Sequence, residues 1–127
     1  MIAYGRLPLM ITENCLVQNE TGCRLDRQGP CVPEDGPCRC GQPNVLVDRT
    51  GAAFPLLPAY GHRTEIQNSK PLYLADRPEH RRLGLAYARL RFTTETAEEC
   101  VSVVQNYLDA APAAGDFTRG LYERGVE

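Results

Sequence analysis

The sequence contains no long hydrophobic run, and this absence argues against a membrane protein. No stretch of its 127 residues approaches the roughly 18 consecutive apolar residues that a membrane-spanning helix requires. Residues 1–6 include no apolar segment followed by small residues at a cleavage site, so they do not predict a secretory signal. We therefore expect a cytoplasmic protein without membrane contact, in a compartment where structural disulfides are uncommon.

The chain also lacks an excess of positive charge. With 14 Lys and Arg against 16 Asp and Glu, the formal net charge is −2, whereas nucleic-acid-binding domains usually carry a strongly basic patch. The composition therefore gives no sign of RNA binding, although it does not bear on a basic surface elsewhere in a longer protein. A hydrophobic content of 43% and a charged content of 24% are typical of globular proteins, and the length predicts one domain, residues 1–127.

Familiar catalytic motifs are missing as well. The sequence has no Gly-rich phosphate-binding loop, no His-Glu-x-x-His motif and only two histidines, His62 and His80. Neither histidine lies in a context that assembles a Ser-His-Asp or Cys-His set. His80 is expected on a solvated helix face, and His62 either in an exposed loop or as a late metal ligand. The sequence thus assigns no catalytic residue.

What the sequence does contain is cysteine, and five of its six cysteines lie in one segment: Cys15, Cys23, Cys31, Cys38 and Cys40. The surrounding Gly, Pro, Asn and Asp residues cannot form an apolar core, so we expect a covalent or coordinative link to hold the segment. Four thiolates suffice for zinc or an iron–sulfur cluster. The gaps of seven, seven, six and one residues do not include the two-residue gap of a zinc knuckle. A metal or cluster, free thiols and disulfides all stay open at this point.

Apolar periodicity predicts strands in the first part of the chain. A short buried strand is expected over residues 2–12, with Pro8 at an edge or an end. A hairpin turn is expected at residues 48–51. The other expected strands or apolar strand-like runs cover residues 44–47, 53–57, 63–69, 71–75 and 85–92.

Two helices are expected later in the chain. Pro78 suits the first turn of a short helix over residues 79–84. Thr96 is the expected N-cap of a longer helix that ends near Ala110. One apolar face of that helix is expected to consist of Cys100, Val101, Val104, Tyr107 and Leu108. Cys100 is therefore expected to be a buried structural cysteine.

These elements divide the chain into four regions. They are a cysteine-rich loop (residues 13–43), a hairpin region (44–69), a βα region (71–111) and an extended tail (112–127). In the βα region, the order strand, helix, strand, helix predicts a parallel strand pair joined by a right-handed crossover. The chain begins within an element, so we expect it to be a fragment of a longer protein.

Several runs of sequence resemble the peptidase U32 family, which is often described as a family of collagenase-like proteases. They occur in the family's order and span nearly the whole chain: residues 4–10 (YGRLPLM), 46–51 (LVDRTG) with Phe54 and Pro55, 68–72 (NSKPL) and 118–127 (TRGLYERGVE). The resemblance covers the C-terminal part of a typical member and lacks its N-terminal β/α barrel units. It implies an α/β fold, or α+β for the isolated fragment, in which a β-α-β-α portion closes a barrel-like body. The cysteine-rich loop and the β-hairpin would be insertions in that body.

The resemblance also implies a metal site. Cys15 and Cys23 match the family's signature pair, although they are separated by a longer gap than its common form. In relatives this pair holds an iron–sulfur cluster together with two later cysteines. Here Cys38 or Cys40 is the expected third ligand, and His62 is the candidate for the fourth. An iron–sulfur cluster or zinc is the expected cofactor.

For function, the resemblance implies a U32-type peptidase that acts on peptide or protein substrates. This fragment is expected to be inactive without the missing N-terminal part of its own chain, because a barrel active site draws residues from several strand ends. Some relatives serve RNA modification or cofactor hydroxylation instead, and RNA would then be a partner of the intact protein. A third expectation is a non-catalytic structural or substrate-binding module.

Overall fold

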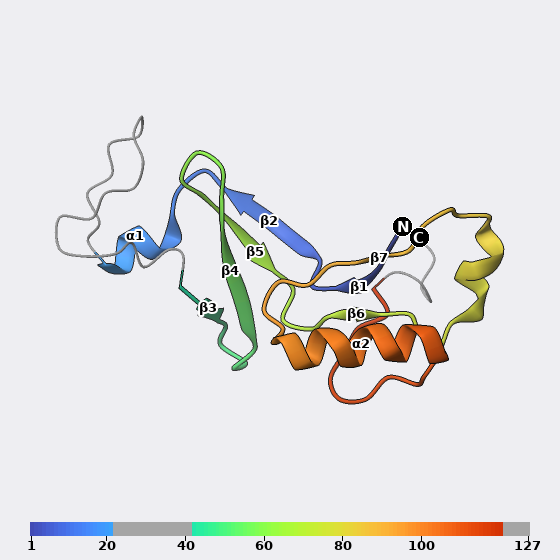
Figure 1. Ribbon diagram of the computed structural model, residues 1–127. Coiled ribbons are helices and arrows are strands. Elements are labelled where there is room, and N and C mark those ends of the chain that lie inside the picture. The colour runs from blue at the N-terminus through green and yellow to red at the C-terminus, as the bar shows by residue number, and fades with distance from the viewer. Residues whose placement is uncertain (22–41, 121–127) are drawn as a thin grey trace. The chain divides into compact units, whose positions relative to one another are not determined.

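A computed structural model describes residues 1–21 and 42–120 of the chain (Figure 1). Contacts divide it into two compact units, Met1–Leu7 with Lys70–Glu127 (unit 1) and Pro8–Ser69 (unit 2). The elements of unit 1 are β1 (Ile2–Gly5), β6 (Leu72–Tyr73), the 3-10 helix η2 (Pro78–Leu83), β7 (Arg89–Leu90) and α2 (Ala97–Asp109). Those of unit 2 are β2 (Pro8–Thr12), α1 (Leu16–Thr21), β3 (Asn44–Val47), β4 (Ala53–Ala59) and β5 (Arg63–Gln67).

Unit 2 is built on an antiparallel sheet with the strand order β2-β5-β4-β3 (Figure 1). The predicted hairpin is confirmed by the pairing of β3 with β4. In its turn, Asp48 Oδ1 accepts hydrogen bonds from the backbone N–H groups of Thr50 at 2.7 Å and Ala52 at 3.0 Å. Gly51 adopts a φ of 84°, which a residue without Cβ tolerates well. The predicted third strand is confirmed as β5.

The single buried strand predicted over residues 2–12 is wrong, because the chain forms two strands that belong to different sheets. The two strands separate after Gly5, which has a φ of 120°. A residue with a Cβ atom at this position would collide with the carbonyl oxygen of Arg91. The second strand, β2, begins at Pro8 on an edge of its sheet, as predicted for this proline. It is not buried, since Leu9, Met10 and Ile11 are each more than half exposed.

Part of the predicted cysteine-rich loop is also helical. Residues 16–21 form α1, where a loop was expected because Gly, Pro and polar residues dominate the segment as a whole. The six residues LVQNET contain neither Gly nor Pro, and these are the residues that most disfavour a helix. Residues 22–41 lie outside the described part of the chain.

Unit 1 contains a sheet with the order β6-β1-β7, in which β1 is antiparallel to β6 and parallel to β7. The predicted parallel pairing of the two strands after residue 71 is wrong. Strand β1, from the start of the chain, lies between β6 and β7. The predicted strand at residues 85–92 is reduced to the two residues of β7. The short helix predicted after residue 77 is confirmed as η2, with Pro78 in its first turn and Gly84 in the left-handed conformation at its end.

Helix α2 confirms the predicted start and end. Thr96 Oγ1 accepts a hydrogen bond from Glu99 N, and the Glu99 carboxylate accepts one from Thr96 N at 2.7 Å, which together make a capping box. The helix ends before Ala110, whose φ is 53°. Its predicted apolar face is only partly used, because Tyr107 packs against the core whereas Val101 and Leu108 are each 71% exposed. Val103, which was not predicted to belong to this face, also packs against the core. Cys100 is partly buried and not buried as predicted.

The core of unit 1 is aromatic. Tyr4 and Tyr73 are buried, with ring centroids 6.5 Å apart, and Phe92, Tyr107 and Phe117 pack around them. The contact of Phe117 corrects the expectation of a tail extended over the surface, at least for residues 117–120. A further backbone bridge ties Thr118 to β6. Residues 121–127 lie outside the described part of the chain.

The fold therefore combines helices and strands in an α+β arrangement. Within residues 1–21 and 42–120, neither sheet closes into a barrel. A helix long and apolar enough to cross a membrane is likewise not found among these residues.

Candidate functional site

Cys15 lies in unit 2, between the end of β2 and the start of α1. Its side chain belongs to the small set of buried residues, with 8% exposure. The neighbouring backbone is held by Thr64 on β5. Thr64 Oγ1 accepts a hydrogen bond from Leu16 N at 3.0 Å and donates one to the Asn14 carbonyl oxygen at 3.3 Å. Because Thr64 is itself only 3% exposed, it fixes the backbone on both sides of Cys15. No pattern in the sequence pointed to Thr64.

Cys15 and His62 line the same hollow, which has a volume of about 210 Å³. Its other walls are largely apolar and come from Val17 on α1 and from residues 56–59 of β4. His62 lies in the tight turn between β4 and β5, where it has a φ of 58° and follows Gly61 with a φ of 72°. The turn therefore places His62 in the wall of the pocket that Cys15, far away in the sequence, also lines.

A second, more polar hollow of about 440 Å³ shares His62 and Arg63 with the first. Arg63 Nη2 forms an ion pair with Glu13 at 3.0 Å, and both side chains are well exposed, so the pair contributes little to stability. Tyr60, at 95% exposure, stands at the rim of this hollow.

The structure thus brings together two of the predicted ligands, Cys15 and His62. The predicted ligands Cys23, Cys38 and Cys40 lie outside the described residues, as does Cys31. Among residues 1–21 and 42–120, no group of three or more His, Cys, Asp or Glu side chains could hold a metal ion. Cys15 and His62 therefore share a pocket, and thiolate and imidazole are both ligand types of structural zinc sites, which need four ligands.

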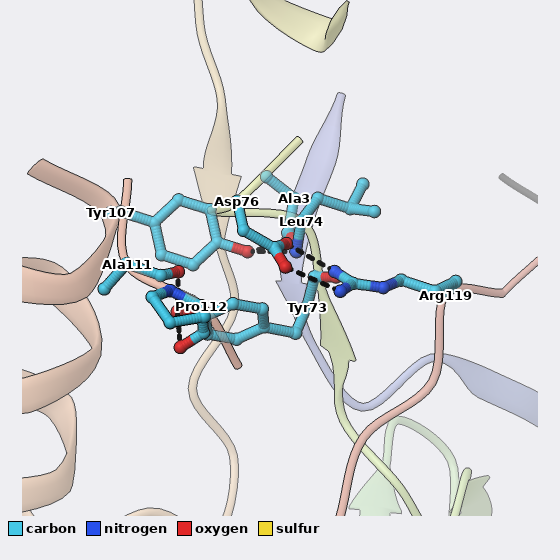
Figure 2. A network of polar contacts seen from close by, with 8 residues as sticks. All are labelled: Ala3, Tyr73, Leu74, Asp76, Tyr107, Ala111, Pro112 and Arg119. Atoms are coloured by element: carbon cyan, nitrogen blue, oxygen red, sulfur yellow. Dashed lines mark hydrogen bonds and ion pairs between the residues drawn. The ribbon is translucent and has the colours of Figure 1, made fainter. Parts of the chain in front are cut away.

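Unit 1 has a separate polar network that the sequence did not reveal (Figure 2). Arg119 donates to both carboxylate oxygens of Asp76, at 2.6 and 2.7 Å, and to the Tyr73 carbonyl oxygen at 2.7 Å. The guanidinium carbon also lies 4.5 Å from the centroid of the Phe117 ring. The hydrogen bonds from Arg119 hold the pKa of Asp76 below its usual value.

Tyrosine hydroxyls complete this network. Tyr107 donates to the Ala3 carbonyl oxygen and accepts from Leu74 N at 2.8 Å, while Tyr73 donates to the Ala111 carbonyl oxygen at 2.9 Å (Figure 2). Burial raises the pKa of Tyr107 to about 12. The neutral tyrosine hydroxyls join backbone segments around Ala3, Leu74 and Ala111, so the network stabilises the fold of unit 1.

Comparison of the chain with protein-family models, with curated proteins and with solved structures found no match. The resemblance to the peptidase U32 family therefore depends on the motifs of the sequence itself.

Proposed function

We propose that this chain is the thiolate-bearing C-terminal module of a U32-type protein and that Cys15 is a ligand of a metal ion or iron–sulfur cluster. The observation that supports the proposal is the burial of Cys15 in a hollow that His62 also lines. A soft thiolate ligand is best kept away from water and oxidants, and burial beside apolar walls provides this. Cys23 with Cys38 or Cys40 would complete the ligand set.

In this proposal the chain's own residues position the ligand. Thr64 holds the backbone around Cys15, and the turn at Gly61 places His62. Val17 and the apolar side chains of β4 limit the access of water to the hollow. A bound cluster would supply electron-transfer or redox chemistry.

Peptide hydrolysis by the intact protein is the activity that the family resemblance suggests, with peptides or proteins as substrates. Iron–sulfur-dependent hydroxylation of RNA or of a cofactor is the second candidate, and the buried Cys15 favours it, because a cluster ligand has an evident use in that chemistry. In both cases unit 1 would be the closing portion of a barrel-like body whose other strands come from a preceding part of the chain.

The first prediction concerns metal content. Anaerobically purified protein should contain iron and sulfide, with absorbance at about 400 nm, or zinc in equimolar amount. Cys15→Ser should lose most of the bound metal because a hydroxyl is a poor ligand for these ions. Cys100→Ser is the matched control, since Cys100 is a partly buried cysteine of unit 1, and it should retain the metal.

Elemental analysis and absorbance spectra measure the bound metal in the wild type and in both variants. A metal-free wild-type protein, or full retention of metal by Cys15→Ser, would contradict the proposal.

A further inference from the structure

Helix α2 has an apolar stripe that the core of unit 1 does not use. We define the α2 stripe by its four residues, Ala97, Val101, Val104 and Leu108. Successive members are four, three and four positions apart in the sequence. This spacing keeps side chains on one side of a helix and forms the seam between two packed helices. All four are exposed, with 71% for Val101, 42% for Val104 and 71% for Leu108.

The core contact of α2 is made by another side of the helix. Val103 and Tyr107 are the residues of α2 that pack against the buried aromatic cluster. The stripe is therefore additional to the face that holds α2 in place. Three exposed aliphatic residues in a seam pattern are unusual for a helix whose remaining surface is polar.

The stripe continues into a groove of about 380 Å³. Val104 and Leu108 form one wall of the groove, and Leu85, Tyr87 and Leu90 contribute to the rest. Tyr87 is 85% exposed and Leu85 is 49% exposed. The apolar surface is consequently wider than one helix face and includes a concave groove.

The charges beside the α2 stripe indicate the charge of a partner that would bind there. Helix α2 contains Glu98, Glu99 and Asp109 and has neither Lys nor Arg between residues 97 and 109. Glu98 and Asp109 each follow a stripe residue directly and are exposed. At 3.6 residues per turn they lie on the same border of the stripe, together with Gln105, which donates to Asp109 at 2.9 Å.

This acidic border disfavours a second copy of the chain as the occupant. In an antiparallel pairing of two α2 helices, Glu98 of one copy would face Asp109 of the other, and like charges across a helix seam are destabilising. A helix with Lys or Arg beside its apolar face would instead place opposite charges next to Glu98 and Asp109.

We propose that the α2 stripe and its groove bind an amphipathic helix whose apolar face is bordered by Lys or Arg. The site lies in unit 1 and is independent of the cysteine site proposed for unit 2. Apolar contact with the stripe provides the affinity, and the acidic border selects the sign of the partner's charge.

Two synthetic peptides of three heptads test the proposal on the full chain. Both have Leu at positions a and d, and one has Lys at positions e and g where the other has Glu. Neither peptide pairs with itself, because like charges repel across its own seam. In fluorescence anisotropy, the Lys peptide should bind at least about tenfold more tightly than the Glu peptide.

Variants of the stripe and of its border identify the site. Val101→Asp should weaken binding of the Lys peptide by at least about tenfold, because it places a charge in the apolar contact. Val45→Asp is the matched control, since Val45 is a 56% exposed valine of unit 2, and it should leave the affinity unchanged. The double variant Glu98→Lys with Asp109→Lys reverses two exposed charges, removes the Gln105–Asp109 hydrogen bond and should reverse the preference between the peptides.

Circular dichroism confirms that each variant is folded before binding is measured. The proposal is overturned if the Lys peptide does not bind, if both peptides bind equally, or if Val101→Asp binds as the wild type does. Self-association of the wild-type chain in sedimentation that Val101→Asp abolishes would also overturn it, because the stripe would then belong to a dimer.

Discussion

At the scale of single residues, the pair of Asp76 and Arg119 is a charged contact largely withdrawn from water. Their side chains are 23% and 16% exposed, and two parallel hydrogen bonds join them. Bidentate pairs of this kind are the stronger class of ion pair in proteins. The pair links the segment after β6 to the segment after α2, so its loss affects the packing of unit 1 directly.

We expect Asp76→Asn to lower the free energy of unfolding by about 2 kcal/mol, because it leaves the Arg119 charge without its carboxylate. Asp116→Asn is the matched control. Asp116 pairs with Lys70 at 2.8 Å but is 78% exposed, so its loss should cost less than about 0.5 kcal/mol. Urea unfolding followed by circular dichroism measures both changes. Equal effects of the two substitutions would contradict the prediction.

The same pair gives stability a pH dependence of known sign. The pKa of Asp76 is lowered by the hydrogen bonds from Arg119, so the unfolded chain takes up the proton more readily than the folded chain. The stabilisation is complete above the usual aspartate pKa of about 4 and is lost as the pH falls through the lower pKa of the folded state. Stability of Asp76→Asn should therefore fall less steeply below about pH 4 than that of the wild type.

At the scale of elements, the start of α2 shows how much a local pattern can predict. Thr96 was predicted as the N-cap from its residue type and position, and in the structure it forms a capping box with Glu99, three residues later. The hairpin of β3 and β4 is similarly local, since Asp48 and Gly51 determine its turn. These two elements depend on neighbouring residues and were for this reason predicted correctly.

Thr96→Ala should lower the free energy of unfolding by about 1 kcal/mol, because Glu99 N loses its hydrogen-bond acceptor. Ser102→Ala is the control within the same helix. Ser102 is exposed, and alanine is the better helix former, so this change should be neutral or slightly stabilising. The comparison fails if Ser102→Ala destabilises the protein as much as Thr96→Ala does.

Non-local contacts explain the strands that were predicted wrongly. Strand β1 pairs with β6 and β7, which lie more than sixty residues further along the chain, and no local pattern carries this information. The separation of β1 from β2 depends on Gly5 meeting the Arg91 backbone, again a distant partner. At the candidate site, the sequence identified Cys15 and His62 by residue type, but only the structure showed that one hollow joins them.

At the scale of the whole molecule, the described part of unit 1 has one three-stranded sheet and unit 2 one four-stranded sheet. Among residues 1–21 and 42–120, few apolar residues are buried. A barrel active site needs residues from the ends of several strands. The strands described here are fewer than such a site requires.

We therefore expect the isolated chain to be inert towards gelatin and casein. Release of soluble peptides after incubation should equal that of a mock preparation purified in the same way. Cleavage above the mock level that persists after a second purification step would show that the chain carries a complete active site.

The pairing of β1 with β6 also has a consequence for synthesis on the ribosome. Tyr4 is opposite Tyr73, and the chain between them contains all of unit 2. Strand β1 must therefore wait, unpaired with β6, until unit 2 has emerged, and the Asp76–Arg119 ion pair can form only after Arg119 appears. Unit 2 can fold as soon as its own residues are available, so the order of folding reverses the order in which the two units begin in the sequence.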